Sequence, residues 1–331
     1  MPLKKRRGTY MVYGALTAFL ERDCLPPSGI LLTTVLSGGC PLSCPFCIIN
    51  QRDERRRKSY VTAEHLTGVL EALRRRNLLG GAAIVGDEPL QPQSWPSAEK
   101  FLGAANKAGA QSALITSGYN LIDYVGDLKL LTQTKFVVSI DAVGSEHDKI
   151  RRTPGAFARI SEGLRLAARD AGLSRRISLA TILMPGNLAE IRRIIDFAAE
   201  LQLPQLLLSP LLTSTRTTAL AVHPRIMKEA WHAIPELLSH ANSVGVKLRV
   251  SDEFAALDMW QEKLAETGIE IVAPSEPARL VRIDAAGRVE TLASMHSGVS
   301  TELRLPEDPG KVDGFVASLV NQCFPLIAVA A

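Results

Sequence analysis

Three cysteines fall within eight residues in the stretch Leu36-Ser37-Gly38-Gly39-Cys40-Pro41-Leu42-Ser43-Cys44-Pro45-Phe46-Cys47. The apolar run ILLTTV, residues 30–35, comes directly before this stretch and predicts a buried strand. A strand that ends in a glycine-rich loop with three thiols suits metal binding, because cysteine thiolates are the usual ligands of iron–sulfur clusters. Since a full [4Fe–4S] cluster takes four ligands, three local cysteines would leave one iron open.

The spacing Cys-x3-Cys-x2-Cys, with Phe46 just before the third cysteine, resembles the signature of the radical S-adenosylmethionine (SAM) superfamily. The resemblance implies that Cys40, Cys44 and Cys47 hold a [4Fe–4S] cluster, that SAM chelates the open iron, and that Phe46 belongs to the cofactor site. It also implies that one electron cleaves SAM to methionine and a 5′-deoxyadenosyl radical, which takes a hydrogen atom from the substrate. An alternative is a structural zinc site with a distant histidine as its fourth ligand.

The composition of the 331-residue chain indicates a globular protein with a large core, since 46% of the residues are hydrophobic and 22% are charged. The formal net charge of +4 is small, so we expect no nucleic-acid partner. The sequence has no run of about 18 apolar residues and no signal peptide, so we expect no membrane span. Five cysteines, three of them clustered, suit a reducing compartment, and we expect a cytoplasmic protein.

From residue 29 the sequence alternates between short apolar runs and amphipathic stretches, which is typical of a parallel sheet with helical crossovers. The apolar runs predict six strands, at residues 30–35, 81–85, 112–116, 136–140, 177–183 and 205–208. The amphipathic stretches predict helices at residues 62–76, 94–108, 121–131, 156–171 and 188–201. Since a closed barrel has eight strand–helix units, we predict an α/β fold with a partial (β/α)6 TIM-like barrel. The resemblance to radical SAM enzymes implies the same fold.

The regions on either side of the alternation predict a chain in three parts. Residues 1–28 would form a basic tail and a helix at 10–22, and residues 29–211 the barrel. Residues 212–331 would form a smaller α+β extension that covers the barrel, with helices at 224–244, 253–267 and 312–323, a strand at 247–250, and a hairpin at 281–291. This extension contains a single cysteine, Cys323, so we expect no auxiliary cluster with four cysteine ligands.

The second predicted strand ends in Val85-Gly86-Asp87-Glu88-Pro89, which resembles the Gly-Gly-Glu-Pro turn that binds the amino group of SAM in radical SAM proteins. Asp87 stands where the family usually has its second glycine. The resemblance assigns Gly86, Asp87 and Glu88 to the cofactor site. Because an acidic group suits an ammonium, we expect Glu88 or the backbone beside it to bind there. The alternative is a Gly–Pro turn with a structural role only.

The fourth predicted strand continues into VSIDAVG, residues 138–144, and EHDKIRR, residues 146–152. This stretch resembles the Ser-x-Asp-Gly and His-Asp-x-x-Arg segments of the family. The resemblance implies that Ser139 and Asp141 contact the SAM ribose or the substrate. It also implies that Arg151 binds the SAM carboxylate, since a guanidinium group fits a carboxylate. His147 fits a hydrogen-bonding role at a helix start better than a catalytic one.

Three other strand ends supply candidates by the same resemblance. Ser117, after the third strand, would reach the SAM carboxylate. Met184 and Ser209, after the fifth and sixth strands, would border the adenine. The charged run QRDERRRK, residues 51–58, follows the cysteines and is typical of a solvated surface; the alternative is a site for an anionic substrate.

Cys323 allows two interpretations. Phe315, Leu319 and Cys323 stand at i, i+4 and i+8 and share one helix face. Such a stripe is typical of core packing, where cysteine acts as a small hydrophobe. The alternative, by resemblance to some radical SAM epimerases, is a thiol that donates a hydrogen atom to a substrate radical.

These features predict a single-cluster radical SAM enzyme that acts on a small molecule. A sugar, nucleoside or aminoglycoside would undergo epimerisation, dehydrogenation, decarboxylation or elimination. Few residues precede the first strand and the auxiliary-cluster cysteines are missing, which favours a small substrate over a peptide. One alternative is modification of a ribosomally made peptide, and another is a non-catalytic, zinc-stabilised binding protein. We expect an electron donor such as flavodoxin or ferredoxin as a partner, and the sequence indicates no oligomeric state.

Overall fold

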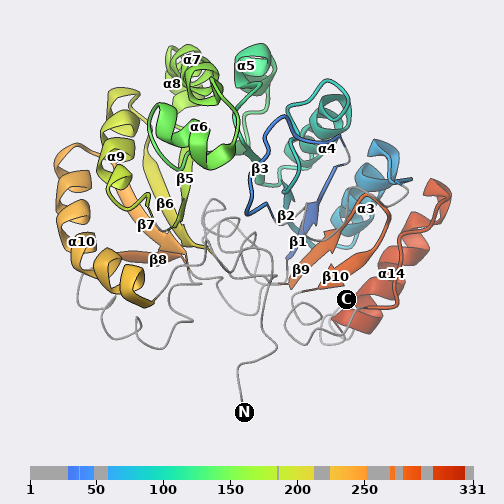
Figure 1. The fold of residues 1–331 in the computed structure, drawn as a ribbon. Helices are drawn as coiled ribbons and strands as arrows, with labels where there is room; N and C mark the ends of the chain where they lie inside the picture. The colour runs from blue at the N-terminus through green and yellow to red at the C-terminus, as the bar shows by residue number, and fades with distance from the viewer. Residues whose placement is uncertain are drawn as a thin grey trace.

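The structure is a computed structural model that describes residues 29–36, 38–47, 59–184, 186–211, 224–251, 269–272, 279–291 and 301–324. Within these residues, ten strands form one sheet in the order β10-β9-β1-β2-β3-β4-β5-β6-β7-β8. The sheet curves into an arch, and its helices lie along the outer side of that arch (Figure 1). This arrangement confirms the predicted α/β fold of the partial-barrel type.

The central part of the sheet is formed by β1 (Ile30–Thr34), β2 (Leu79–Ile84), β3 (Ser112–Thr116), β4 (Thr134–Ser139), β5 (Ile177–Leu183) and β6 (Gln205–Pro210). Each of these strands pairs in parallel with the next. The connecting helices are α3 (Ala63–Arg75), α4 (Trp95–Lys107), α5 (Leu121–Leu130), α7 (Ala156–Ala168) and α9 (Glu190–Glu200). All of these elements lie where the sequence predicts them. Two further helices, α6 (Ser145–Arg151) and α8 (Ala171–Ser174), were not predicted because they are too short to show a periodic pattern.

The chain after residue 211 extends the same sheet at both edges. After α10 (Pro224–Ser243), β7 (Lys247–Ser251) pairs in parallel with β6, and β8 (Glu270–Val272) pairs with β7. At the other edge, β9 (Arg279–Ile283) pairs in parallel with β1 and forms the predicted hairpin with β10 (Val289–Thr291). A short 3-10 helix, η5 (Pro309–Lys311), and α14 (Val312–Cys323) follow.

The described part of the sheet therefore has more parallel strands than the six predicted, because β7, β8 and β9 also pair in parallel with their neighbours. The two outer strands of a six-stranded sheet leave main-chain groups unpaired, and these later strands satisfy them. The helices expected at residues 10–22 and 253–267 lie outside the described residues. In the part of the chain that the structure describes, no helix is long and apolar enough to cross a membrane.

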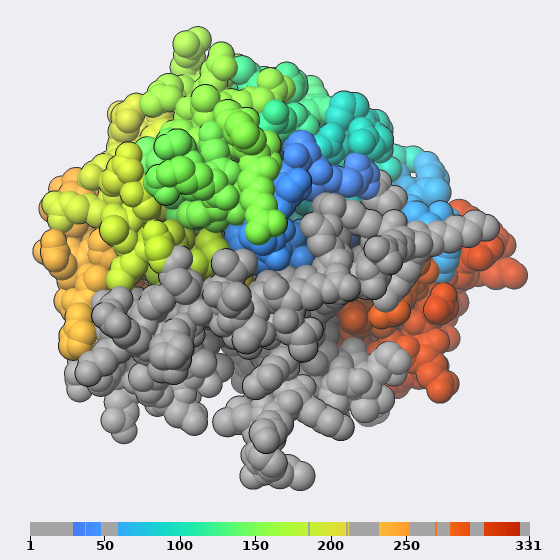
Figure 2. Space-filling view, in the orientation of Figure 1, coloured from blue at the N-terminus to red at the C-terminus, as the bar shows by residue number. Residues whose placement is uncertain are grey.

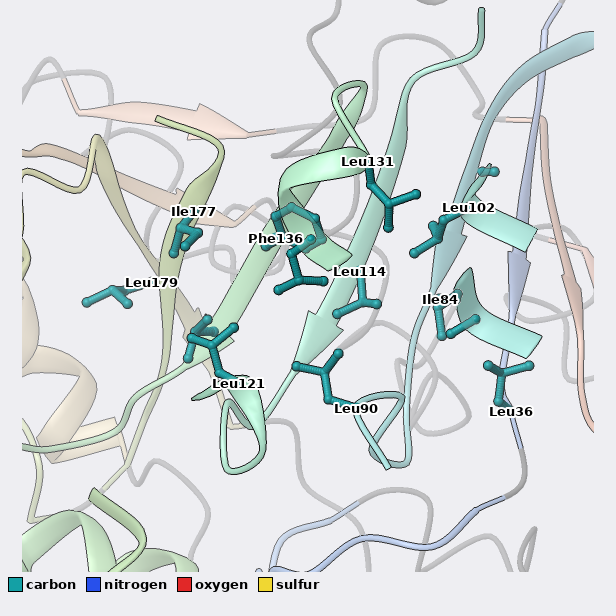
Figure 3. Packing of buried hydrophobic residues seen from close by; sticks show 14 of the residues in the cluster. Leu36, Ile84, Leu90, Leu102, Leu114, Leu121, Leu131, Phe136, Ile177 and Leu179 are labelled. Atoms are coloured by element: carbon teal, nitrogen blue, oxygen red, sulfur yellow. The ribbon is translucent and has the colours of Figure 1, made fainter. Parts of the chain in front are cut away.

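Apolar side chains fill the layer between the sheet and the helices (Figure 3). Leu114 of β3 and Phe136 of β4 are fully buried there, together with Leu102 of α4 and Leu121 of α5. Strands of a parallel sheet are buried on both faces, which explains why they read as continuous apolar runs in the sequence. This packing fixes the relative positions of the strand ends, where the candidate site residues lie.

Gly118 follows β3 and has a left-handed backbone, with φ +78. A Cβ atom at this position would lie 2.7 Å from Val138 Cγ1 and 3.1 Å from Ile160 Cγ2. We expect Gly118→Ala to lower the free energy of unfolding by about 2–4 kcal/mol, through the left-handed conformation and the overpacking together. Urea unfolding of the purified protein measures this change.

Gly109 provides the matched control, since its φ is +72 and a Cβ atom added to it would have no neighbour within 4 Å. Gly109→Ala therefore carries the backbone cost alone, which is about 1–2 kcal/mol. Equal losses of stability in the two variants would contradict the packing argument for Gly118.

Candidate functional site

The candidate site lies at the edge of the sheet where β1 to β6 end. Because these strands are parallel neighbours, their carboxyl ends meet at one edge, which is where ligand sites of such sheets lie. The cysteine loop, residues 38–47, follows β1 at this edge. In the space-filling view this segment, in blue, borders the green segment around α6 (Figure 2). The strand-end turns and the cysteine loop are therefore parts of one site.

Apolar side chains and backbone hydrogen bonds hold the cysteine loop. Leu42 and Phe46 are each 4% exposed and belong to the core. The Cys47 N–H donates to the Cys44 carbonyl at 3.2 Å, which forms a turn between two of the thiols. Cys44 is buried, whereas Cys40 and Cys47 are partly exposed. The loop thus buries its apolar residues and keeps two thiols accessible.

The thiols of the loop fit an iron–sulfur cluster. Burial raises the pKa of Cys40 to about 12, and the nearby Glu88 contributes to the rise. Burial also raises the pKa of Cys44, although Arg151 opposes this effect. Metal ligation requires the thiolate form of cysteine. The positive charge of bound iron is therefore needed to stabilise the thiolates of Cys40 and Cys44 against their raised pKa values. Cys40 and Cys44 would therefore bind iron only where the metal offsets the cost of losing their protons.

The zinc alternative would need several ligands that share one metal ion. Among the described residues, no three histidine, cysteine or acidic side chains converge closely enough to share a single metal ion. Sulfur atoms bound about 2.3 Å from one zinc ion would lie within roughly 4 Å of each other. A [4Fe–4S] cluster instead spreads its cysteine ligands over several irons.

Glu88 is fully buried, and its carboxylate accepts four hydrogen bonds. Oε1 accepts from Thr116 Oγ1 at 2.5 Å and from the Leu90 N–H at 3.0 Å. Oε2 accepts from the Ser117 N–H at 2.8 Å and from the Ser117 hydroxyl. Burial raises the pKa of Glu88, and these hydrogen bonds oppose the rise. The carboxylate joins the turns after β2 and β3, and contact of Glu88, or of the backbone beside it, with the SAM amino group stays a prediction.

Asp87 and Gly39 connect the turn after β2 to the cysteine loop. Asp87 has φ +51, a left-handed conformation that explains why glycine is the usual residue at this position. Its Oδ2 accepts a hydrogen bond from the Gly39 N–H at 3.3 Å, and the Glu88 N–H donates to the Gly39 carbonyl at 3.1 Å. Asp87 and the left-handed Gly86, with φ +78, therefore lie directly beside the cysteines.

Asp141 and Arg151 form a buried ion pair, with Asp141 Oδ2 2.6 Å from Arg151 Nε. Asp141 is fully buried and Arg151 is 7% exposed. Arg151 Nη1 donates to Cys44 Sγ at 3.7 Å, and its carbonyl accepts from the Ser43 N–H at 3.3 Å. Burial would lower the pKa of Arg151, but Asp141 and Cys44 raise it on balance. The side chain expected at the SAM carboxylate is thus bound to Asp141 and to the cysteine loop.

Three neighbours hold Asp141 in place. The Asp141 N–H donates to His147 Nδ1 at 3.2 Å, and Oδ1 accepts from the Ile182 N–H at 3.0 Å. The Asp141 carbonyl accepts from Asn187 Nδ2 at 3.0 Å. Burial, and to a lesser degree Arg151, lowers the pKa of His147 to about 3, so this ring is a neutral hydrogen-bond acceptor. The hydrogen-bonding role expected for His147 agrees with this contact.

The other predicted positions lie at the same edge. Ser117 contacts Glu88, whereas Ser139 ends β4 and is partly exposed. Met184 and Ser209 are buried after β5 and in β6.

Asn187 was missed by the sequence prediction. It is fully buried, its Oδ1 accepts from the Met184 N–H at 2.8 Å, and its Nδ2 donates to the Ile182 carbonyl at 2.8 Å. The turn-forming Gly186-Asn187 pair was the available signal.

Cys323 lies at the end of α14, which packs against α3 on the outer side of the sheet (Figure 1). Phe315 and Leu319 of the same helix are buried in the core. The helix therefore does not cover the open side of the sheet, as the donor role would require. Burial raises the pKa of Cys323, as expected for a packed thiol.

We expect Cys323→Ala to keep the reaction product and turnover of the parent enzyme, with a small loss of stability from the lost packing. Mass analysis of the product and urea unfolding check the two parts of this prediction. A variant that cleaves SAM but yields an altered product would contradict the packing role.

Comparisons with known proteins agree with this site. The model of the radical SAM superfamily matches residues 34–198, about half of the chain. No curated protein sequence is significantly similar. SuiB from Streptococcus suis, in a structure with its precursor peptide SuiA, has a TM-score of 0.64 at 13% identity and covers 90% of this chain and 67% of SuiB. SuiB bound to SAM has a TM-score of 0.61 at 14% identity, over 79% of this chain and 60% of SuiB.

A third similar structure, anSMEcpe with bound SAM, has a TM-score of 0.57 at 15% identity and covers 80% of this chain and 74% of that protein. At these identities the likeness shows the fold alone, and in the SAM-bound comparison the chain spans 60% of the length of SuiB. The family match, the partial barrel and the three cysteines at its edge lead to the same conclusion. The chain belongs to the radical SAM superfamily, and it is an enzyme of the class whose cofactors are a [4Fe–4S] cluster and SAM.

Proposed function

We propose that this radical SAM enzyme modifies a peptide, by abstracting a hydrogen atom from one of its residues. The observation that carries the proposal is the extent of the likeness to SuiB in its precursor-peptide complex, which covers 90% of this chain. The family match ends at residue 198, so the likeness includes elements beyond the common core. The complex of anSMEcpe with a peptide, at a TM-score of 0.54, has the same fold and adds support.

Cys40, Cys44 and Cys47 would hold the cluster, which, when bound, supplies the electron that cleaves SAM to the hydrogen-abstracting radical. The turn after β2 would bind the amino group of SAM through the backbone carbonyls of Gly86 and Asp87. The Asp87 carboxylate, beside Gly39, adds negative charge that favours an ammonium group. Ser117, Met184 and Ser209 would line the SAM site from the ends of the next strands.

The proposal includes an external electron donor, because the cluster must be reduced by one electron before each cleavage of SAM. A small electron-transfer protein such as flavodoxin or ferredoxin would supply the electron. A reducing, cytoplasmic setting suits free thiols that serve as cluster ligands.

The second candidate is a small-molecule substrate such as a sugar, nucleoside or aminoglycoside. One observation favours it: residues 48–331 contain only one cysteine, Cys323, so they cannot supply the four ligands of an auxiliary cluster. The two candidate functions predict different results: either a peptide or a small molecule should stimulate SAM cleavage.

The test uses anaerobically purified enzyme with its cluster, SAM and dithionite, and compares peptides with small molecules. The peptides are the products of short reading frames beside the gene, and the small molecules are the three classes named above. We expect a peptide to stimulate 5′-deoxyadenosine formation and to change in mass. Stimulation by a small molecule, with every peptide unchanged, would overturn the proposal in favour of the second candidate. The Cys40, Cys44 and Cys47 triple alanine variant controls for modification that does not require the cluster.

A further inference from the structure

Arg151 makes three contacts with the cysteine loop, two through its guanidinium group and one through its carbonyl. Its Nη1 donates to Cys44 Sγ at 3.7 Å, its guanidinium carbon lies 5.3 Å from the centre of the Phe46 ring, and its carbonyl accepts from the Ser43 N–H at 3.3 Å. The residue ends α6, far along the chain from the loop it binds. A cation therefore lies beside the sulfur of the middle cluster ligand.

The position of this cation is fixed from the opposite side. Asp141 Oδ2 lies 2.6 Å from Arg151 Nε, and the carboxylate is itself held by the Ile182 N–H at 3.0 Å. Asn187 and His147 bind the backbone of Asp141 at 3.0 Å and 3.2 Å. Since Asp141 is fully buried and Arg151 is 7% exposed, water does not screen the guanidinium as it would a surface charge.

Hydrogen bonds to cluster sulfurs and the net charge around a cluster set its reduction potential. When the cluster takes up one electron it becomes more negative, so a nearby cation and donor stabilise the reduced form more than the oxidised form. We propose that the Arg151 guanidinium raises the reduction potential of the cluster by donating to, and placing a positive charge beside, the Cys44 sulfur. Asp141 is the residue that positions this guanidinium.

The proposal rests on the cluster that Cys44 ligates and does not depend on the substrate. A peptide that remains unmodified would overturn the proposed function and leave this proposal standing. Conversely, an unchanged cluster potential would overturn this proposal and leave the peptide substrate standing.

The experiment is an anaerobic redox titration of the cluster-loaded enzyme, with the reduced cluster followed by electron paramagnetic resonance. In Arg151→Met, we expect the ratio of reduced to oxidised cluster at a fixed solution potential to fall at least tenfold. For a one-electron couple this corresponds to a midpoint potential lower by about 59 mV or more. Arg151→Lys keeps the positive charge, so its midpoint potential should lie closer to that of the parent enzyme than to that of Arg151→Met.

Lys149→Met is the matched control, because it removes one positive charge from the same helix at an exposed position, where Lys149 pairs with Glu146. Its midpoint potential should equal that of the parent enzyme. Arg151→Gln removes the charge but keeps a hydrogen-bond donor. Its midpoint potential is compared with that of the parent enzyme if Arg151→Met fails to retain the cluster. A midpoint potential in Arg151→Gln or Arg151→Met equal to that of the parent, at equal iron content, would overturn the proposal.

Discussion

Alanine in place of Cys40, Cys44 and Cys47 is expected to abolish iron binding and, with it, cleavage of SAM. The parent enzyme should hold about four irons per chain, because the three clustered thiols supply the protein ligands of one cluster. Burial raises the pKa of Cys40 and of Cys44, so these thiols ligate iron only when the metal compensates for the lost protons. Iron and sulfide content, with the visible absorbance of anaerobically purified protein, measures the effect.

Cys323→Ala is the matched control for this loss, since it removes a thiol from the outer helix α14 and should leave the iron content unchanged. A triple variant that still holds a reducible four-iron centre would show that the ligands lie elsewhere in the chain.

Glu88→Gln is expected to give the second large effect, a loss of about 2–4 kcal/mol in the free energy of unfolding. The carboxylate accepts from two backbone N–H groups, of Leu90 and Ser117, one on each oxygen. A glutamine amide has only one oxygen, so its NH₂ group would face one of these two N–H donors, and that N–H would lose its acceptor and meet a second donor instead. Buried donors without partners cost about 1–3 kcal/mol each. Urea unfolding of the anaerobic holoenzyme measures the change.

Glu146→Gln provides the comparison, because Glu146 is a solvent-exposed carboxylate whose partner is Lys149 on the same helix. Exposed ion pairs of this kind contribute little to stability. If Glu88→Gln is no less stable than Glu146→Gln, then Glu88 does not join the turns after β2 and β3.

The sequence predicted the central sheet because each of its strands is a local pattern. For example, β1 is buried at every position and β5 at most positions, as expected for parallel strands that are covered on both faces. The hairpin was also predicted, since its glycine turn is local: the Gly287 N–H donates to the Asp284 carbonyl at 2.9 Å. Strand order was harder, because β9 pairs with β1 across most of the chain and no local pattern records that pairing.

The candidate site shows the same difference between features that are local in the sequence and features that depend on distant segments. The cysteine spacing indicated the cluster ligands because all three lie in one loop. For Glu88 and Arg151, the resemblance to the family and the charge of each side chain suggested contacts with the two ends of SAM. The structure gives both side chains partners within the protein: Thr116 and Ser117 for Glu88, and Asp141 for Arg151. Sequence shows which charge a residue carries, whereas the number of donors around it depends on contacts between distant segments.

The packing of α14 illustrates a further limit. A stripe of residues such as Phe315 and Leu319 shows which face of a helix is buried, but it does not show which layer of the fold covers that face. The same pattern suited a helix over the open side of the sheet and a helix against α3. The contact between α14 and α3 decides between them.

Radical chemistry at the cysteine loop is tested by the fate of SAM in the reduced enzyme. Anaerobic protein with about four irons per chain is incubated with SAM and dithionite, and the mixture is analysed by chromatography and mass spectrometry. We predict 5′-deoxyadenosine and methionine in equal amounts, both dependent on the reductant and both absent from the triple cysteine variant. Bound SAM that stays intact beside a fully reduced four-iron cluster, with or without peptide, would contradict this assignment.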